Sequence, residues 1–124
     1  MKPYDFSYTR ATSLSHLYDL FDEYGDGLKI LAGGQSLITT LNMRLSSPEM
    51  LVDINDLSEI SSISLTDNIV SVGALVRHAE IQESNDIKQH VPLLKLAIEH
   101  VAHAAIRNRG THGGSIAFAD PAAE

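Results

Sequence analysis

The chain carries the run Leu28-Lys29-Ile30-Leu31-Ala32-Gly33-Gly34-Gln35-Ser36-Leu37, an apolar segment that leads directly into two glycines. Residues 28–32 have the length of a short buried strand, and residues 35–45 can form a helix. Glycine lets a backbone approach a ligand closely, because it has no Cβ. Successive N–H groups at such a turn, at the start of a helix, attract a phosphate. The run therefore predicts a strand, a tight turn and a helix that can bind an anion.

The segments on either side of this run complete a small α/β unit. Upstream, residues 6–8 can form a short strand, and the hydroxyl residues 12 or 13 can cap a helix. The apolar residues of that helix share one face, and they are Leu14, Leu17, Leu20, Phe21 and Tyr24. Downstream, Pro48 ends the second helix and residues 50–54 form another strand. We expect residues 1–58 to form a β-α-β-β subdomain with the two glycines at a strand-to-helix turn.

A change of pattern near residue 60 predicts a second subdomain, residues 59–124. Residues 60–65 and 69–72 flank the turn cluster Thr66-Asp67-Asn68, which is typical of a β-hairpin. Residues 76–83 and 93–105 are expected to be helical, the latter with an apolar stripe formed by Leu94, Ala97, Ile98, Val101 and Ala105. One hairpin needs a further strand or a covering layer to be stable. We therefore expect this subdomain to be incomplete and the chain to be truncated.

A second pair of glycines lies in the run Thr111-His112-Gly113-Gly114-Ser115. Each pair stands where an apolar or helical segment turns, with a hydroxyl residue just after it, and each by itself can be an ordinary tight turn. Lys29, Arg107 and Arg109 can supply cations, and Gln35 and Ser36 can supply side-chain donors. Two such motifs favour a dinucleotide whose pyrophosphate they share, so we expect them to face one cleft.

The composition excludes several classes of protein. The formal net charge of −7 argues against binding to nucleic acid or anionic membranes, which are polyanions. The absence of cysteine excludes disulfides, thiolate nucleophiles and cysteine-ligated iron–sulfur clusters. No run approaches the ~18 apolar residues of a membrane span, and the N-terminus does not resemble a signal peptide. We therefore expect a soluble, cytoplasmic protein.

Other site motifs are missing from the sequence. It contains no Gly-x-Gly-x-x-Gly fingerprint and no P-loop, which argues against a Rossmann dinucleotide site and a P-loop ATPase. It also contains no Gly-x-Ser-x-Gly elbow, which argues against the common serine hydrolases. His100 and His103 lie three residues apart on an expected helix, but no carboxylate motif completes a metal site there. The acidic residues Asp19, Asp22, Glu23 and Asp26 indicate a solvated helix end. We assign no metal site, no catalytic acid and no nucleophile.

The two glycine motifs and their surroundings resemble the FAD-binding (medium) subunits of molybdenum hydroxylases of the carbon monoxide dehydrogenase and xanthine dehydrogenase type. The resemblance rests on residues 29–37 with 41–45, and on residues 106–115 followed by 119–124. It covers essentially the whole chain. It implies an α+β fold of the vanillyl-alcohol oxidase and molybdenum hydroxylase flavoprotein type. This FAD-binding domain is called PCMH-type. In that fold a small α/β subdomain and an antiparallel-sheet subdomain hold FAD between them.

The resemblance also implies which residues contact FAD. The first subdomain would wrap the pyrophosphate with Leu31, Ala32, Gly33, Gly34, Gln35, Ser36 and Leu37. The second would wrap it with Thr111, His112, Gly113, Gly114 and Ser115. Val101 would pack near the flavin or adenine, and Asp120 and Glu124 would make polar contacts. The family usually has an aliphatic residue in place of His112, so this histidine changes the polarity beside the second motif.

The implied function is electron transfer within a multi-subunit oxidoreductase. A molybdenum cofactor on a large subunit would oxidise the substrate, and 2Fe–2S clusters on a small subunit would carry the electrons to FAD. The flavin would then reduce NAD, quinone or oxygen, because the flavin itself supplies the redox chemistry. We expect the isolated chain to be inactive. Two alternatives stay open: a non-catalytic fragment of the same fold that has lost FAD, and a standalone FAD oxidase.

Overall fold

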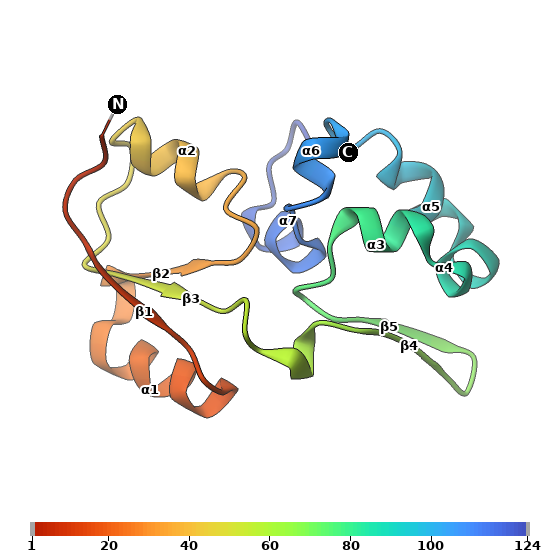
Figure 1. Cartoon of the computed structure of the whole chain (residues 1–124), viewed down its shortest axis with the longest axis horizontal. Helices are drawn as coiled ribbons and strands as arrows, with labels where there is room; N and C mark the ends of the chain where they lie inside the picture. Colours follow the sequence, from red (N-terminus) through yellow and green to blue (C-terminus); the bar gives the residue numbers. More distant parts are fainter. Residues whose placement is uncertain (1, 124) are drawn as a thin grey trace. The chain divides into compact units, whose positions relative to one another are not determined.

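The computed structural model describes residues 2–123, and the chain divides into two compact units, Met1–Ser58 and Glu59–Glu124. The first unit is a parallel sheet with one helix on each face. The second is an antiparallel hairpin followed by short helices (Figure 1). Parallel and antiparallel pairing are thus segregated along the chain, which is the arrangement of an α+β protein.

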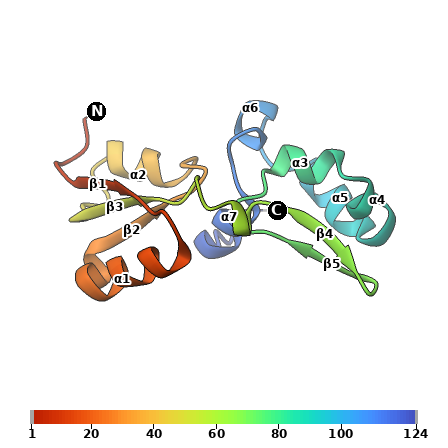
Figure 2. The same cartoon turned by 60° about the horizontal axis from the view of Figure 1, so that its bottom comes forward.

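The sheet of the first unit has the strand order β1-β3-β2. Its strands are β1 (Ser7–Arg10), β2 (Leu28–Leu31) and β3 (Met50–Asp53). Both outer strands run parallel to β3, and Ser7 and Leu28 are each paired with Met50. Helices α1 (Leu14–Tyr24) and α2 (Leu37–Asn42) lie on opposite faces of the sheet (Figures 1 and 2). All four residues of β3 are buried, because a central parallel strand is covered on both faces.

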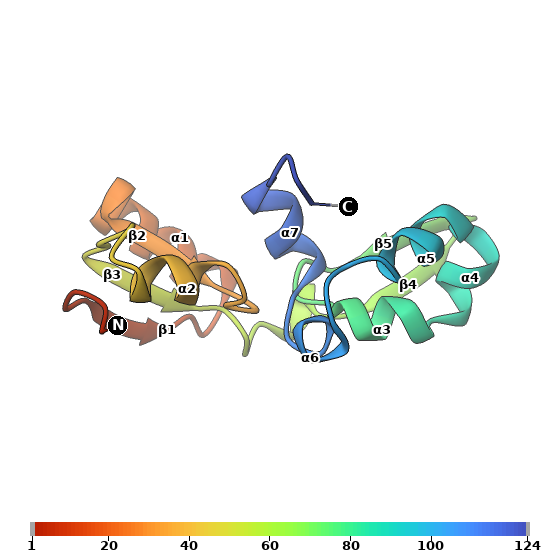
Figure 3. The ribbon, with the colours of Figure 1, turned by 90° about the horizontal axis from the view of Figure 1, so that it is seen from above.

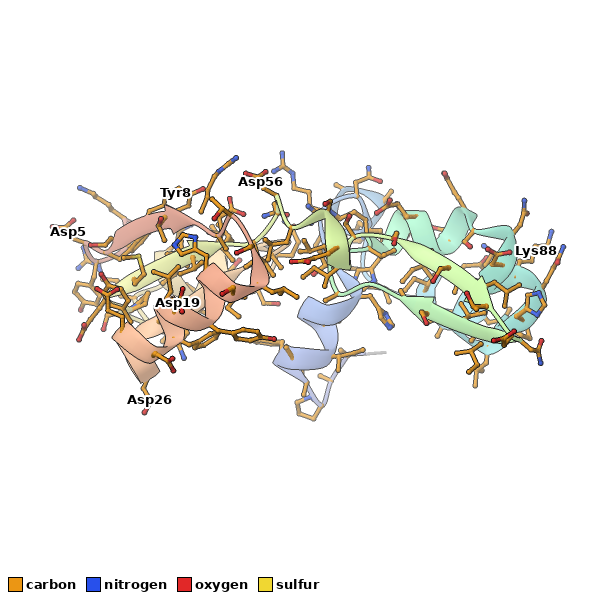
Figure 4. The ribbon with its side chains drawn as sticks, turned by 90° about the horizontal axis from the view of Figure 1, so that it is seen from below. Asp5, Tyr8, Asp19, Asp26, Asp56 and Lys88 are labelled. Atoms are coloured by element: carbon orange, nitrogen blue, oxygen red, sulfur yellow. The ribbon has the colours of Figure 1, made fainter. Side chains whose placement is uncertain are left out.

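Helix α1 begins and ends as its sequence predicts. The hydroxyl of Ser13 accepts a hydrogen bond from the backbone N–H of His16 at 3.0 Å, which caps the first turn. Leu17 and Leu20 are buried against the sheet, and Gly25 ends the helix with a φ of 50°. The acidic residues of the helix and of the turn after it are exposed, as expected, and Figure 4 labels two of them, Asp19 and Asp26.

Two expectations about the first unit are wrong in detail. Strand β2 is not fully buried: Lys29 and Ile30 are exposed, because β2 is an edge strand of a three-stranded sheet. Helix α2 covers six residues and ends well before Pro48, so proline does not stop it. Instead, the chain turns at Arg44, which has a left-handed φ of 58°. The backbone N–H of Leu45 then donates a hydrogen bond to the carbonyl of Thr40 in the last turn.

The expected hairpin of the second unit consists of β4 (Ile63–Thr66) and β5 (Ile69–Val72). The two residues at its tip, Asp67 and Asn68, have φ values of 50° and 64°, which is the geometry of a type I′ turn. Asp and Asn tolerate this conformation better than most residues do. The first strand is shorter than expected, because residues 58–60 form a 3₁₀ turn.

Helices cover one face of this hairpin, as Figure 3 shows from above. These helices are α3 (His78–Glu83), α4 (Asn85–His90) and α5 (Pro92–Ile98). Two further helices, α6 (Ala104–Arg107) and α7 (His112–Phe118), follow them in the chain. The core of the unit is formed by four buried residues: Val76, Ile81, Ile87 and Ile98. Ile63, Val70 and Val72 of the hairpin pack against that core. This apolar layer holds the two-stranded sheet in place.

The prediction of a single helix over residues 93–105 is wrong. The chain breaks at Ala102, which has a φ of 42°, and α5 and α6 are separate. Arg107 stabilises the break, because its Nη1 donates to the carbonyls of Val101 at 2.9 Å and Ala102 at 3.1 Å. Helix α4 was not expected either, although the Ser84 hydroxyl caps it at the N–H of Ile87. Expected helix 76–83 is present as the shorter α3.

Candidate functional site

The first glycine loop, residues 32–36, joins β2 to α2, so the predicted strand-to-helix turn is confirmed. Gly34 has a φ of 71°, a conformation that residues with a Cβ adopt rarely. A Cβ at this position would also lie 3.1 Å from Cγ1 of Ile38 and 3.2 Å from Cδ1 of Leu31. The backbone angle strains any residue with a Cβ at position 34, and the close side chains of Leu31 and Ile38 add to the preference for glycine.

The backbone N–H groups of the first glycine loop face away from protein acceptors. Within residues 2–123, the N–H groups of residues 33–37 donate to no backbone or side-chain oxygen. The loop carbonyls are used, because those of Gly34 and Ser36 accept from Ile38 and Thr40 and start α2. The side chain of Gln35 folds back, and its Nε2 donates to the carbonyl of Gly33 at 2.9 Å. A row of successive donors is what an anion such as a phosphate group needs.

Asn55 ties this loop to the end of strand β3. Its Nδ2 donates to the carbonyl of Ala32 at 2.9 Å and to Oδ1 of Asp53 at 2.6 Å. The backbone N–H of Asn55 donates to the same Oδ1 at 2.9 Å, which makes the turn after β3 an Asx turn. Sequence reasoning did not identify Asn55, although an Asp two residues before an Asn at a strand end is a recognisable signal for such a turn.

Asp53 is the centre of a polar network at the carboxyl ends of β1 and β3. The residue is 7% exposed, and its Oδ2 accepts from the hydroxyl of Tyr8 at 2.8 Å. Arg10 donates from Nε to that hydroxyl at 3.2 Å and from Nη1 to Asp56 at 2.8 Å (Figure 4 labels Tyr8 and Asp56). Burial alone would raise the pKa of Asp53, but the hydrogen bonds from Asn55 and Tyr8 and the charge of Arg10 outweigh it and lower the pKa.

The second glycine motif, residues 111–115, differs from the expected open turn. Gly113 and Gly114 lie in the first turn of α7, and neither is among the residues with positive φ. The Thr111 hydroxyl caps this helix by accepting from the N–H of Gly114 at 3.1 Å. The N–H groups of His112 and Gly113 donate to the carbonyls of Val76 and Ala74, both at 2.9 Å. The backbone of this motif is therefore committed to protein acceptors, and the expectation of free N–H groups here is wrong.

Side chains of the second glycine motif remain available for a ligand. The hydroxyl oxygen of Ser115 lies 3.0 Å from Nε2 of His78, which is buried beneath α7. Partial burial lowers the pKa of His112 from its ordinary value of 6.5, so its imidazole is neutral at pH 7. Thr111 is 2% exposed and its hydroxyl serves as the helix cap. The motif thus offers a neutral surface with one exposed hydroxyl.

The other residues expected at the site lie outside the two glycine motifs. Val101 is partly buried and packs against the core of the second unit. The Asp120 carboxylate accepts from the backbone N–H of Ala122 at 2.9 Å, and Glu124 lies outside the described residues. Of the expected cations, Lys29 and Arg109 are exposed, whereas Arg107 is held by backbone carbonyls. The two glycine motifs belong to different units, and their convergence on one cleft stays a prediction.

Residues 2–123 contain no cluster of three or more side chains suited to hold a metal ion. His100 and His103 are both exposed. None of the helices in this part of the chain is long and apolar enough to cross a membrane.

The curated proteins that resemble this chain are subunits of dehydrogenases, as the predicted family implies. The chain is 48% identical over its full length to the 6-hydroxypseudooxynicotine dehydrogenase complex subunit alpha of Paenarthrobacter nicotinovorans, and covers 42% of that protein. It is 41% identical, also over its full length, to the caffeine dehydrogenase subunit beta of a Pseudomonas strain. It is 35% identical over 121 residues to the carbon monoxide dehydrogenase medium chain of Hydrogenophaga pseudoflava. The chain thus spans about two fifths of the length of these relatives, 42% in each case.

Solved structures agree with the predicted fold class. A carbon monoxide dehydrogenase structure from Hydrogenophaga pseudoflava superimposes with a TM-score of 0.97 at 35% identity over the whole chain and 43% of the matched chain. Quinoline 2-oxidoreductase from Pseudomonas putida 86 superimposes with a TM-score of 0.95 at 43% identity, with the same coverage. The predicted α+β flavoprotein fold is therefore confirmed.

The family model described as the FAD binding domain in molybdopterin dehydrogenase matches residues 4–124. This range includes both glycine motifs and the Asn55 turn. The predicted family and its cofactor, FAD, are confirmed by this match. The chain belongs to the family of FAD-binding domains of molybdopterin dehydrogenases.

Proposed function

We propose that this chain holds the FAD of a molybdenum hydroxylase by binding the pyrophosphate at the first glycine loop. The observation that carries the proposal is the row of backbone N–H groups at residues 33–37, which donate to no acceptor within residues 2–123. A pyrophosphate oxygen placed there receives several hydrogen bonds at once. This arrangement suits an acidic chain of net charge −7, because local dipoles can bind an anion that the overall field repels.

The flanking residues of the loop complete the proposed contact. Leu31 precedes the row of donors and Leu37 ends it, and Ser36 is exposed. Gln35 holds the loop in shape through its bond to Gly33. Ala32 and Gly34 contribute backbone only, which leaves room for the phosphate groups to approach.

The second glycine motif contributes in a different way from the first in this proposal. Its backbone N–H groups already donate to protein acceptors. The proposed contact to FAD therefore comes from the Ser115 hydroxyl and from the surface of His112, Gly113 and Gly114. Thr111 supports that surface as the cap of α7. Val101, Asp120 and Glu124 are proposed to contact other parts of the cofactor.

The flavin supplies the redox chemistry when it is bound, and this chain binds and orients it. We further propose that the chain acts within a complex, with a large molybdenum cofactor subunit and a small 2Fe–2S subunit. The flavin then receives electrons from the clusters and passes them to NAD, quinone or oxygen. Relatives named as subunits or medium chains of dehydrogenases support this division of labour. These 124 residues contain no cysteine, so they supply no thiolate ligand to such clusters.

Titration with FAD and with riboflavin tests the proposed site. Riboflavin lacks the pyrophosphate, so we expect it to bind far more weakly than FAD. Gly34→Ala places a Cβ into a left-handed, crowded position, and we expect the affinity for FAD to fall by about tenfold or more. Gly25→Ala is the matched control, because Gly25 also has a positive φ but has no atom within 4 Å of its would-be Cβ.

Equal binding of FAD and riboflavin would contradict the proposal, as would an unchanged affinity in Gly34→Ala. Absence of flavin binding by the chain would favour the alternative of a fragment that has lost FAD. Flavin fluorescence and absorbance give both affinities directly, and thermal unfolding shows whether each variant is folded.

A further inference from the structure

The side chain of Asn55 links the first glycine loop to the end of strand β3. The Nδ2 group of Asn55 lies between two acceptors, the carbonyl oxygen of Ala32 at 2.9 Å and Oδ1 of Asp53 at 2.6 Å. Two acceptors on one side require the nitrogen of the amide there, which fixes the orientation of the side chain. Asn55 therefore acts as a donor to the loop and not as an acceptor.

Asp53 keeps Asn55 in this orientation. Its Oδ1 accepts both the backbone N–H and the side-chain N–H of Asn55, while its Oδ2 accepts the hydroxyl of Tyr8. These hydrogen bonds lower the pKa of Asp53, so the carboxylate stays ionised and remains an acceptor at neutral pH. Tyr8 in turn receives a hydrogen bond from Arg10. The chain of contacts runs from the outer strand β1 through β3 to the loop after β2.

The bond to Ala32 also sets the direction of the first donor in the loop. Residues 32 and 33 share one peptide unit, and no described peptide bond is cis. In a planar trans peptide the C=O and N–H groups point in opposite directions. The carbonyl of Ala32 points at Asn55, so the N–H of Gly33 points away from Asn55. That N–H opens the row of donors at residues 33–37.

We infer that Asn55 is a positioning residue for the pyrophosphate of FAD, acting through the Ala32–Gly33 peptide and held by the Asp53 carboxylate. This inference rests on the proposed function of the first glycine loop. Without the Asn55 donor the Ala32–Gly33 peptide can rotate, and the N–H of Gly33 leaves its place in the row. Binding then loses one hydrogen bond and the preorganisation of its neighbours.

Two substitutions in the full chain test the inference. Asn55→Asp keeps the shape of the side chain but removes its donor and places a second carboxylate beside Asp53. Asn55→Ala removes the side chain beyond Cβ. We expect each to move the amide resonance of Gly33 in the ligand-free, ¹⁵N-labelled chain, and to weaken FAD binding by about tenfold. The loss should not extend to riboflavin, which has no pyrophosphate.

Asp56→Asn is the matched control. Asp56 is the next residue, its side chain is 57% exposed, and it pairs with Arg10 without touching the loop. We expect it to leave the Gly33 resonance and the FAD affinity unchanged. Thermal unfolding measured beside the titrations separates a loss of fold from a loss of binding. A folded Asn55→Asp chain binds FAD weakly if Asn55 positions the loop, and binds it normally if Asn55 only stabilises the unit.

The outcomes separate the inference from the proposed function. If the unaltered chain binds FAD and folded Asn55→Asp binds it equally tightly, the inference is wrong and the proposed function stands. If the unaltered chain does not bind FAD, the proposed function fails first. An unmoved Gly33 resonance in both variants would overturn the positioning role by itself, with or without flavin.

Discussion

The hydroxyl oxygen of Thr111 lies 3.1 Å from the backbone nitrogen of Gly114, and a Cβ on residue 114 would lie only 2.6 Å from that oxygen. The helix cap and the glycine therefore depend on each other. The requirement at residue 114 is for space beside the cap and not for a positive φ. Residue 113 has even less space for a side chain, because a Cβ there would lie 2.8 Å from the Cα and from the carbonyl oxygen of Ala74. These are backbone atoms, which cannot move aside as a side chain can.

Gly113→Ala should destabilise the chain more than Gly114→Ala. In the first variant backbone must move, and we expect a loss of about 2 to 3 kcal/mol in the free energy of unfolding. In the second only the Thr111 side chain must rotate, with the loss of one cap, about 1 kcal/mol. Urea denaturation of both variants measures the difference. Equal losses would show that the contact between Gly113 and Ala74 is easily relieved.

Asp53 should make the stability of the chain sensitive to acid. Its pKa in the folded chain is below the ordinary value of 3.8, so the ionised form favours folding. The stabilisation is present above pH 3.8 and is lost as the pH falls below it, through the folded pKa. We expect Asp53→Asn to be less stable than the unaltered chain at pH 7, and the gap to narrow below pH 3.8. Denaturation at several pH values measures the gap, and a constant gap would contradict the assignment.

His112 should contribute a second acid-sensitive step at higher pH. Burial lowers its pKa below the ordinary value of 6.5, so protonation favours the unfolded chain. Stability from the neutral imidazole is complete above pH 6.5 and declines as the pH falls below that value toward the folded pKa. His112→Leu should remove this part of the decline. The NMR titration of the His112 ring gives the folded pKa, and a value at or above 6.5 would refute the prediction.

Arg107→Ala should loosen the bend between α5 and α6. The guanidinium donates to the carbonyls of Val101 and Ala102, and hydrogen bonds from a charged group contribute about 1.5 to 3 kcal/mol. We expect a loss of that order in the free energy of unfolding, and faster hydrogen exchange in residues 99–104. Arg109→Ala is the control, because that side chain is exposed. A similar effect of both substitutions would point to net charge as the cause.

The strongest local patterns in the sequence predicted the fold well. The apolar run before Gly33 became β2 and its turn, and Ser13 capped α1 as a hydroxyl residue should. The pair Asp67 and Asn68 marked a tight hairpin, since both residues tolerate positive φ. In each case the determining interaction lies within a few residues along the chain, so a local pattern is sufficient to reveal it.

The errors arose where distant or side-chain contacts override a local pattern. The apolar stripe over residues 93–105 is compatible with one helix, but Arg107 reaches back to Val101 and Ala102 and supports a break. At the second glycine motif, the carbonyls of Ala74 and Val76 take up the N–H groups, and nothing near Gly113 in the sequence signals that. Asn55 was missed because its acceptor, Ala32, belongs to a different strand end.

The order of strands in the first unit has a consequence for the time at which the site forms. During synthesis β1 and β2 leave the ribosome before β3, yet within the described residues each of them pairs only with β3. Neither can join a sheet until residues 50–53 have emerged, whereas the hairpin β4–β5 joins neighbouring segments. The turn that carries Gly33 and Gly34 therefore stays unanchored through the first part of translation. The hydrogen bond that ties this turn to the sheet can form only when Asn55 follows β3.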